Sequence, residues 1–137
     1  MIIVANTNVI VSALIKPFSD SAQILNMVLS GKVRLAYDTR IITEYVEVLK
    51  RDKFGFDFDH INSIMIQIKE EGVPISSLPV DENLPDKYDL PFIEAALSGA
   101  ADFIVTGNKK HFPKPEYRKI RVVSPSEFLE EYKRTIP

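Results

Sequence analysis

The chain begins with an apolar run at residues 2–4, which breaks into a polar cluster at residues 6–8 before apolar residues resume. A parallel strand that is covered on both faces typically shows such a continuous apolar run. The same arrangement recurs late in the chain, where apolar residues 103–105 are followed by the polar segment 106–109. Ligands of open α/β sheets bind just beyond the carboxyl ends of the strands. The pattern therefore predicts two buried strands, each followed by polar side chains where chemistry is expected.

Apolar residues at strand or helical spacing predict an alternation of elements along the rest of the chain. Strands are expected at residues 2–6, 33–37, 103–105 and 120–123, with a short edge strand at 73–75. Helices are expected to begin at Thr7 or Asn8, at Ser19 or Asp20, at Asp38 or Thr39, at Asp57 or Asp59, at Asp89, and at Ser124 with Pro125. Segments 52–58, 76–88 and 109–119 are expected to be loops. Strands that alternate with helices favour a parallel sheet with helices on both faces.

The composition restricts the class of protein. At 137 residues the chain fits a single domain spanning residues 1–137. It has no cysteine and only two histidines, His60 and His111, which argues against thiol catalysis and a histidine-rich zinc site and fits a cytoplasmic protein. No apolar run approaches the ~20 residues of a membrane span and no secretory signal is evident, so no membrane partner is expected. The net charge of −2 means that any nucleic acid must be met by a local basic patch.

Four polar residues stand where the predicted strands and helices meet. Asn6 ends the first strand, and Asn108 follows the strand at 103–105. Glu44 lies beside the apolar stripe of its helix, and Asp89 occupies the first turn of a buried helix face. Taken singly, Asp89 is equally well explained as a helix cap, and Glu44 is better explained as an exposed helix residue. The asparagines can be simple turn residues. All four fall near one sheet edge if the first strand lies beside the strand at 103–105, and this convergence favours a functional site.

The chemistry expected at this edge is that of a divalent cation with oxygen ligands, for which Mg²⁺ or Mn²⁺ is suited. Such ions polarise a phosphodiester and lower the pKa of a bound water. Cations beside an acidic pocket are what a polyanionic substrate needs, although a charge run is more often a solvated loop. The candidate cations are Lys109, Lys110, His111, Lys114, Arg118, Lys119 and Arg121, with a second patch at Lys50, Arg51 and Lys53. The candidate base-stacking residues are Phe54, Phe56, Phe112 and Tyr117, although packing is the commoner use of each.

Four stretches of the chain together resemble the PIN domain, and in particular the toxin components of toxin–antitoxin pairs. They are VANTNVIVSAL, ITEYVEVLKRDKF, DLPFIEAALSGAADFIVTGNKKHF and SPSEFL, which lie along essentially the whole chain. The resemblance implies a three-layer α/β/α sandwich with a central, mainly parallel sheet. It implies cleavage of RNA with Mg²⁺ or Mn²⁺ held by acidic residues, leaving 5′-phosphate and 3′-hydroxyl ends. It also implies a homodimer and a separate small antitoxin protein as partner.

The family's four acidic positions fall on Asn6, Glu44, Asp89 and Asn108, and its neighbouring polar positions fall on Thr7 and Thr106. Two of the four positions therefore hold amides instead of acids. Asparagine offers one neutral carbonyl oxygen where aspartate offers a negative charge, so the affinity for a metal is expected to fall. Asp38 and Asp86 are candidates for supplying part of the missing charge.

For an active enzyme, the resemblance and the residue chemistry together assign a role to each position. Glu44 and Asp89 bind the metal, and Asn6 adds a neutral ligand or orients a water. Thr7, Thr106 and Asn108 position the water or the scissile phosphate, and Lys109 and Lys110 hold the adjacent phosphates.

Two hypotheses follow from these assignments. The first is a divalent-metal-dependent endoribonuclease of PIN type, and the alternative is a catalytically impaired PIN-fold protein that binds RNA or a protein partner. They differ in whether a metal binds at Glu44 and Asp89. A response-regulator-like or nucleotide-binding domain is disfavoured, because no Gly-rich phosphate loop follows the first strand and no acidic pair ends it. Exposed apolar stripes expected on the helices at 20–30 and 57–71 are compatible with a homodimer.

Overall fold

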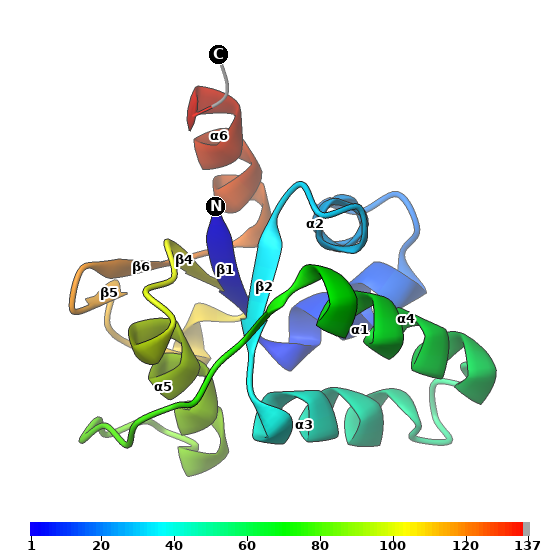
Figure 1. Ribbon diagram of the computed structural model, residues 1–137, viewed down its shortest axis with the longest axis horizontal. Coiled ribbons are helices and arrows are strands. Elements are labelled where there is room, and N and C mark those ends of the chain that lie inside the picture. Colours follow the sequence, from blue (N-terminus) through cyan, green and yellow to red (C-terminus); the bar gives the residue numbers. More distant parts are fainter. Residues whose placement is uncertain (136–137) are drawn as a thin grey trace.

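The computed structural model describes residues 1–135, and it has a central sheet flanked by helices (Figure 1). The strands are β1 (Ile2–Ala5), β2 (Arg34–Tyr37), β3 (Val73–Pro74), β4 (Phe103–Val105), β5 (Glu116–Tyr117) and β6 (Ile120–Val123). The helices are α1 (Thr7–Ile15), α2 (Asp20–Leu29), α3 (Thr39–Leu49), α4 (Phe58–Glu71), α5 (Leu90–Ser98) and α6 (Pro125–Thr135). Short 3₁₀ turns lie at Lys87–Asp89 and Lys109–His111. These elements confirm the predicted α/β class.

The sheet has the strand order β3-β2-β1-β4-β6-β5, and every neighbouring pair is parallel except β5 with β6. After β1 the chain adds β2 and β3 on one side, and then returns to add β4 and β6 on the other. The order therefore reverses between β1 and β4. In open α/β sheets this reversal is where a ligand-binding crevice forms, beyond the carboxyl ends of the strands.

The central strands are buried on both faces, as their continuous apolar runs predict. Every residue of β4 is buried, and so are residues 3–5 of β1. Successive side chains of a strand point to opposite faces, so helices must cover both. Helix α5 contacts β1, β2 and β4, and α6 contacts β4 and β6. Tyr45 of α3 is fully buried, and its hydroxyl donates a 2.5 Å hydrogen bond to the carbonyl of Ala5, which ties α3 to the end of β1.

Side-chain caps begin several helices where the sequence predicts them. Ser19 accepts a hydrogen bond from the Ala22 amide at the start of α2, and Asp38 accepts one from the Ile41 amide at the start of α3. The expected cap of α1 at Thr7 or Asn8 is wrong, because the preceding residue, Asn6, holds the cap position and makes no side-chain cap bond. The Asn6 side chain is therefore left for other contacts.

Two further expectations are wrong. The segment 109–119 is not all loop, because Glu116 and Tyr117 pair with β6 as the edge strand β5. A two-residue strand carries too little periodicity to be seen in a sequence. The apolar stripes at 20–30 and 57–71 are not exposed, because α2 and α4 contact one another and bury them within the chain.

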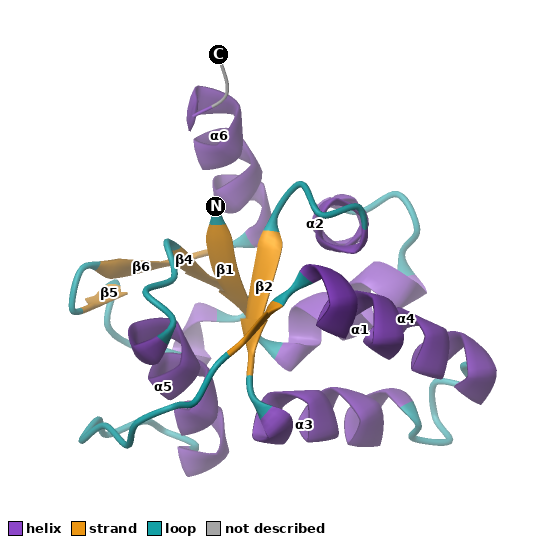
Figure 2. Cartoon of the chain, viewed as in Figure 1, coloured by secondary structure: helices purple, strands orange, loops and turns teal. Residues whose placement is uncertain are grey.

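The segment between β3 and α5 is a long irregular connection (Figure 2). Two carboxylates from helix α5 and from the start of α3, those of Glu94 and Asp38, fix the course of this connection. The Ser77 hydroxyl donates to Asp38 at 2.8 Å, and the Val80 amide donates to the buried Glu94 at 3.0 Å. Within the described residues, no helix is both long enough and apolar enough to cross a membrane.

Candidate active site

A pocket of about 700 Å³ lies at the carboxyl ends of β1 and β4, where the strand order reverses. Its lining includes Asn6, Glu44, Asp89 and Asn108, the four residues singled out from the sequence. They come from the end of β1, the middle of α3, the start of α5 and the loop after β4. The structure thus brings into one hollow side chains that are far apart in the sequence.

The pairing of β1 with β4 sets the floor of this pocket. The Asn6 amide donates to the Val105 carbonyl at 2.9 Å, and the Thr106 amide donates to the Val123 carbonyl at 3.0 Å. These two bonds extend the ladder one step beyond the strands. The segments that leave β1 and β4 are consequently held side by side, each with polar side chains at its start.

Asp89 is a buried carboxylate held from two sides. Asn6 Nδ2 donates to Asp89 Oδ1 at 3.4 Å, and His111 Nδ1 lies 2.7 Å from Asp89 Oδ2. Because an ionised carboxylate only accepts hydrogen bonds, the nitrogen of the Asn6 amide must face it. The oxygen of that amide then faces Thr106, whose hydroxyl lies 3.4 Å away. Asn6, expected as a neutral metal ligand, therefore orients Asp89 in this structure.

Thr106 is fully buried and does not line the pocket, so the expected direct contact with substrate is not supported. Its hydroxyl accepts hydrogen bonds from Asn8 Nδ2 at 3.4 Å and from the Asn108 amide at 3.2 Å. Asn8 Oδ1 in turn accepts a 2.8 Å bond from the Gly107 amide. Thr106 thus joins the segments after β1 and β4 beneath the pocket floor.

Glu44 is half-buried, and Thr7 donates its hydroxyl hydrogen bond to Glu44 Oε2. Burial raises the pKa of the Glu44 carboxyl above its usual range; the Thr7 hydrogen bond opposes the shift, while the charges of Asp89 and Asp86 raise the pKa further. The influence of Asp89 and Asp86 means that the three carboxylates share one electrostatic environment. Such a cluster favours a cation between its members.

Asp86 lines the pocket and Asp38 does not, so only one of the two candidates for compensating charge is in place. Asp38 is partly buried beside Arg40, whose Nη2 lies 2.7 Å from Asp38 Oδ2. Burial raises the pKa of Asp38, but hydrogen bonds from Arg40 and Ser77 outweigh burial and hold that pKa below its usual value. Asp38 is therefore a structural residue, and its expected role at the site is wrong.

Of the predicted cations, His111 of the basic loop and Arg51 and Lys53 of the second patch line the pocket, whereas Lys109 and Lys110 do not. Lys109 forms a 2.5 Å ion pair with Glu127, and hydrogen bonding from Lys109 lowers the pKa of Glu127 to about 2. Lys110 is exposed and lies outside the lining. The basic residues that line the pocket are Lys16, Arg51, Lys53 and His111. Of the aromatic candidates, Phe112 and Tyr117 are buried in the core, and Phe54 lines the pocket.

The donor set of the pocket fits a weakly held Mg²⁺ or Mn²⁺. Among residues 1–135 there is no group of three or more His, Cys, Asp or Glu side chains arranged to hold a metal ion. Mg²⁺, however, is commonly bound through one or two carboxylates and completes its coordination with water and substrate phosphates. Each oxygen of Asp89 has a second lone pair beyond its present hydrogen bond, and Glu44 lies in the same pocket.

Sequence reasoning missed the parts played by Asn8 and His111. The sequence indicates Asn8 only as a helix cap and His111 only as one cation of a basic loop. The one available signal is the recurrence of polar residues after two apolar runs, which brings the segments after β1 and β4 side by side and lets the Asn8 side chain reach the Gly107 amide. Nothing local to His111 indicates that it reaches Asp89, 22 residues earlier.

Comparison with known families assigns the fold. The profile of the PIN domain family matches residues 3–110 of the chain. The chain belongs to the PIN domain family. The family inferred from the sequence motifs is thereby confirmed, and the match includes all four pocket residues from Asn6 to Asn108.

A solved structure is similar to this PIN domain over most of its length. It is a chain from the crystal structure of VapBC2 from Rickettsia felis bound to a DNA fragment from their promoter. The TM-score is 0.59 at 16% sequence identity, and the alignment covers 90% of this chain and 98% of that chain. At this identity the likeness shows a common fold. None of the curated proteins matches the chain.

Proposed function

We propose that this PIN domain is a cytoplasmic endoribonuclease that depends on Mg²⁺ or Mn²⁺ and acts as the toxin of a toxin–antitoxin pair. The main support is the pocket at the reversal of strand order, because Glu44 and Asp89 both line it together with Asn6 and Asn108. This is the placement that a divalent cation and a phosphodiester require.

Two groups of pocket residues have different roles in this proposal: one group binds the metal, and the other orients the metal ligands. Glu44 and Asp89 hold the ion, which when bound polarises the phosphodiester and makes an attacking water more acidic. Thr7 orients Glu44, and Asn6 and His111 orient Asp89 through the hydrogen bonds described above. Fixing both carboxylates in advance lowers the cost of ordering them when metal and substrate arrive.

We propose that Asn108 contacts the substrate. It is exposed and lines the pocket, and its Oδ1 accepts a 3.1 Å hydrogen bond from the Lys110 amide. The Nδ2 group is then left to donate to a phosphate oxygen. An amide suits this role better than a carboxylate, which would repel the phosphate.

The partner we propose is a small antitoxin protein, and the assembly we propose is a homodimer. Support for the antitoxin comes from the fold shared with a chain of the VapBC2 structure and from the motifs that resemble toxin components. The homodimer rests on the family resemblance alone, since the apolar stripes of α2 and α4 are buried within the chain.

A second candidate function is a catalytically impaired PIN-fold protein that binds RNA or a protein partner. The observation that favours it is the hydrogen bond from Asn6 Nδ2 to Asp89 Oδ1. An amide nitrogen beside Asp89 supplies a positive dipole where an active metal site needs negative oxygens.

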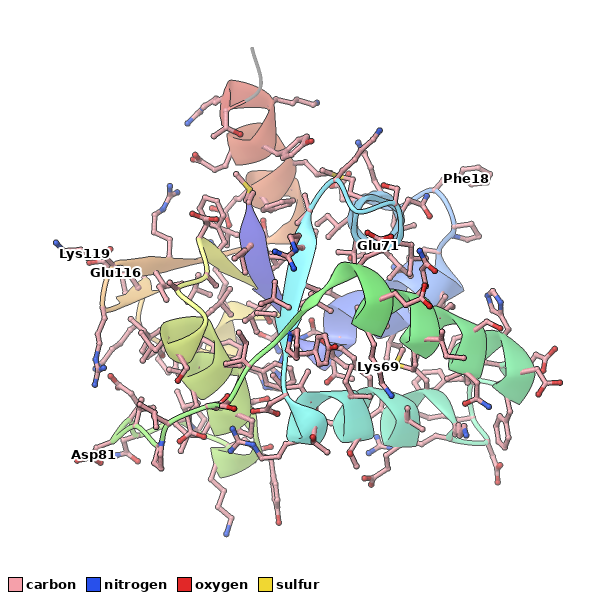
Figure 3. The ribbon with its side chains drawn as sticks, viewed as in Figure 1. Phe18, Lys69, Glu71, Asp81, Glu116 and Lys119 are labelled. Carbon is pink, nitrogen blue, oxygen red and sulfur yellow. The ribbon has the colours of Figure 1, made fainter. Side chains whose placement is uncertain are left out.

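An RNA-cleavage assay with Mn²⁺ separates the two functions. The proteins to compare are the natural chain, Asn6→Asp, Asp89→Ala and, as a control, Asp81→Ala, since Asp81 is exposed on the 75–86 segment and lies outside the pocket (Figure 3). We expect Mn²⁺-dependent cleavage that Asp89→Ala abolishes and Asp81→Ala leaves unchanged. Cleavage only by Asn6→Asp establishes the impaired form, and cleavage that survives Asp89→Ala and chelation of the metal contradicts the proposal.

A further inference from the structure

The pocket is lined by two sets of charged residues. The acidic half consists of Glu44, Asp86 and Asp89, from the middle of α3 and the segment before α5, and the basic half consists of Lys16, Arg51 and Lys53, which follow the C-terminal ends of α1 and α3. Within residues 1–135, none of these three cations has a carboxylate within the 4.0 Å of an ion pair. By contrast, Lys109 and Lys114, which belong to the predicted basic loop, are paired with Glu127 and Glu82. Unpaired positive charge therefore faces the pocket from the C-terminal end of α1 and from the segment after α3.

An aromatic ring stands beside these cations. Phe54 lines the pocket, is only partly buried, and stacks on Phe56 with ring centroids 5.5 Å apart and planes 10° from parallel. Gly55 between them has a φ of +65°, a conformation that residues with a side chain rarely adopt. This turn orients the two rings in parallel, and the second ring supports the first. Lys53 Nζ lies over the Phe54 ring, 5.0 Å from its centroid, so this exposed, flexible side chain must swing off the ring toward a phosphate when a base stacks there.

We propose that Arg51, Lys53 and Phe54 form a nucleotide subsite in which one base of a single-stranded RNA stacks on Phe54 while Arg51 and Lys53 hold the flanking phosphates. This inference rests on the proposed function and names the part of the pocket that selects the substrate. The cleaved phosphodiester lies at the acidic half of the pocket, and the nucleotide on Phe54 lies beyond it toward α4.

The chemistry of the subsite selects a single strand. Every base has a π-face, so an aromatic platform accepts any of them, but the faces of bases in a duplex are covered by their neighbours. Lysine and arginine contact phosphates without reading sequence. The subsite thus favours unpaired RNA over duplex RNA and has little preference among bases.

The test is binding of a short fluorescein-labelled single-stranded RNA, measured by anisotropy in EDTA so that no cleavage occurs. Phe54→Leu removes the platform and keeps an apolar side chain, and we expect the dissociation constant to rise about tenfold or more. Lys53→Gln removes one phosphate contact. For this variant we expect weaker binding and a salt slope that is shallower by about 0.7. Phe54→Leu leaves that slope unchanged, because no ion is released from a stacked base.

Two matched controls show whether the effects are local. Phe58→Leu removes an exposed aromatic ring four residues away that does not line the pocket, and Lys69→Gln removes a cation of α4 that also lies outside it (Figure 3). Both should bind RNA as the natural chain does. The melting temperature of each variant shows that it is folded.

The outcomes separate this inference from the proposed function. If the natural chain cleaves RNA with Mn²⁺ but Phe54→Leu and Lys53→Gln bind as tightly as the controls, the subsite is wrong and the nuclease stands. If the natural chain fails to cleave but both variants lose affinity as expected, the subsite stands and the nuclease is wrong. The subsite is overturned if duplex RNA competes as well as single-stranded RNA. It is also overturned if the natural chain does not bind RNA, and Arg51, Lys53 and Phe54 would then be left to contact a protein partner.

Discussion

The side-chain nitrogen of Asn6 donates a 3.4 Å hydrogen bond to the buried carboxylate of Asp89, 83 residues further along the chain. His111 contacts the other oxygen of the same carboxylate at 2.7 Å. The acid at the centre of the pocket is thus held by an amide and an imidazole. This relationship makes residue 6 the most informative position to change.

Replacing Asn6 with aspartate exchanges a favourable contact for the repulsion of two carboxylates. In EDTA we expect Asn6→Asp to lower the free energy of unfolding by about 1–3 kcal/mol, since a hydrogen bond to a charged group is lost. With Mn²⁺ we expect the melting temperature to rise by more than it does for the natural chain, because bound metal stabilises the folded state. Thermal denaturation with and without Mn²⁺ measures both effects.

The matched control for Asn6→Asp is Asn6→Ala, which loses the hydrogen bond but adds no charge. Its stability should not respond to Mn²⁺ more than that of the natural chain. An equal response of Asn6→Asp and Asn6→Ala to Mn²⁺ would contradict a metal site at Asp89.

Glu44 gives the stability of the fold a defined pH dependence. Its pKa in the folded protein is raised, chiefly by burial, above the ordinary value of 4.5. The folded protein therefore holds the Glu44 proton more tightly than the unfolded chain. The resulting stabilisation is complete below pH 4.5 and is lost as the pH rises through the raised pKa.

Glu44→Gln keeps a neutral side chain at every pH and tests this dependence. We expect the variant to be more stable than the natural chain at pH 7 and equally stable at the acidic end of the titration. Its RNA cleavage should fall, because the variant lacks one of the two carboxylates that we propose as metal ligands. Urea denaturation across this pH range measures the difference, and a variant that is less stable at pH 7 than the natural chain contradicts the raised pKa.

Arg40 and Glu94 form a pair that fixes the segment leading to the site. Glu94 is buried, lies 2.7 Å from Arg40 Nη1, and accepts the amide of Val80. Arg40→Met leaves this buried carboxylate without its cation, and we expect a loss of about 2–3 kcal/mol in urea denaturation. Adding Glu94→Leu should restore part of that loss, since the unpaired charge is removed. Strictly additive effects of the two substitutions would show that the pair is not coupled.

The hairpin between β5 and β6 has residues that are poorly suited to its turn. Arg118 and Lys119 have φ values of +46° and +74°, the positive range that a two-residue type I′ turn requires and that Asn-Gly adopts most readily. Lys119 lies at the outer end of this hairpin (Figure 3). We expect Arg118→Asn with Lys119→Gly to raise the free energy of unfolding by about 1–2 kcal/mol. The control, alanine at both positions, removes the same charges without relieving the strain and should show no such gain.

Much of the candidate site could be predicted from the sequence because its members follow local signals. Asn6 directly follows one apolar run and Asn108 lies three residues past another, and Asp89 precedes a helix whose apolar face is evident from its spacing. The cations could not be predicted in the same way. Whether Lys109 is free or paired with Glu127 depends on where α6 packs, and α6 lies beyond the loop in question.

The sequence by itself determined the alternation of strands and helices and most helix starts. Burial on both faces of a strand produces a continuous apolar run, and a helix cap such as Ser19 or Asp38 lies directly before its helix, so both are visible within a few residues. Tertiary structure alone decided that β4 lies beside β1, that Asn6 presents its nitrogen to Asp89, and that Lys53 is turned toward the pocket while Thr106 is buried below it. These relationships join residues that are tens of positions apart. Their energies arise only when the strands have paired, so no local pattern encodes them.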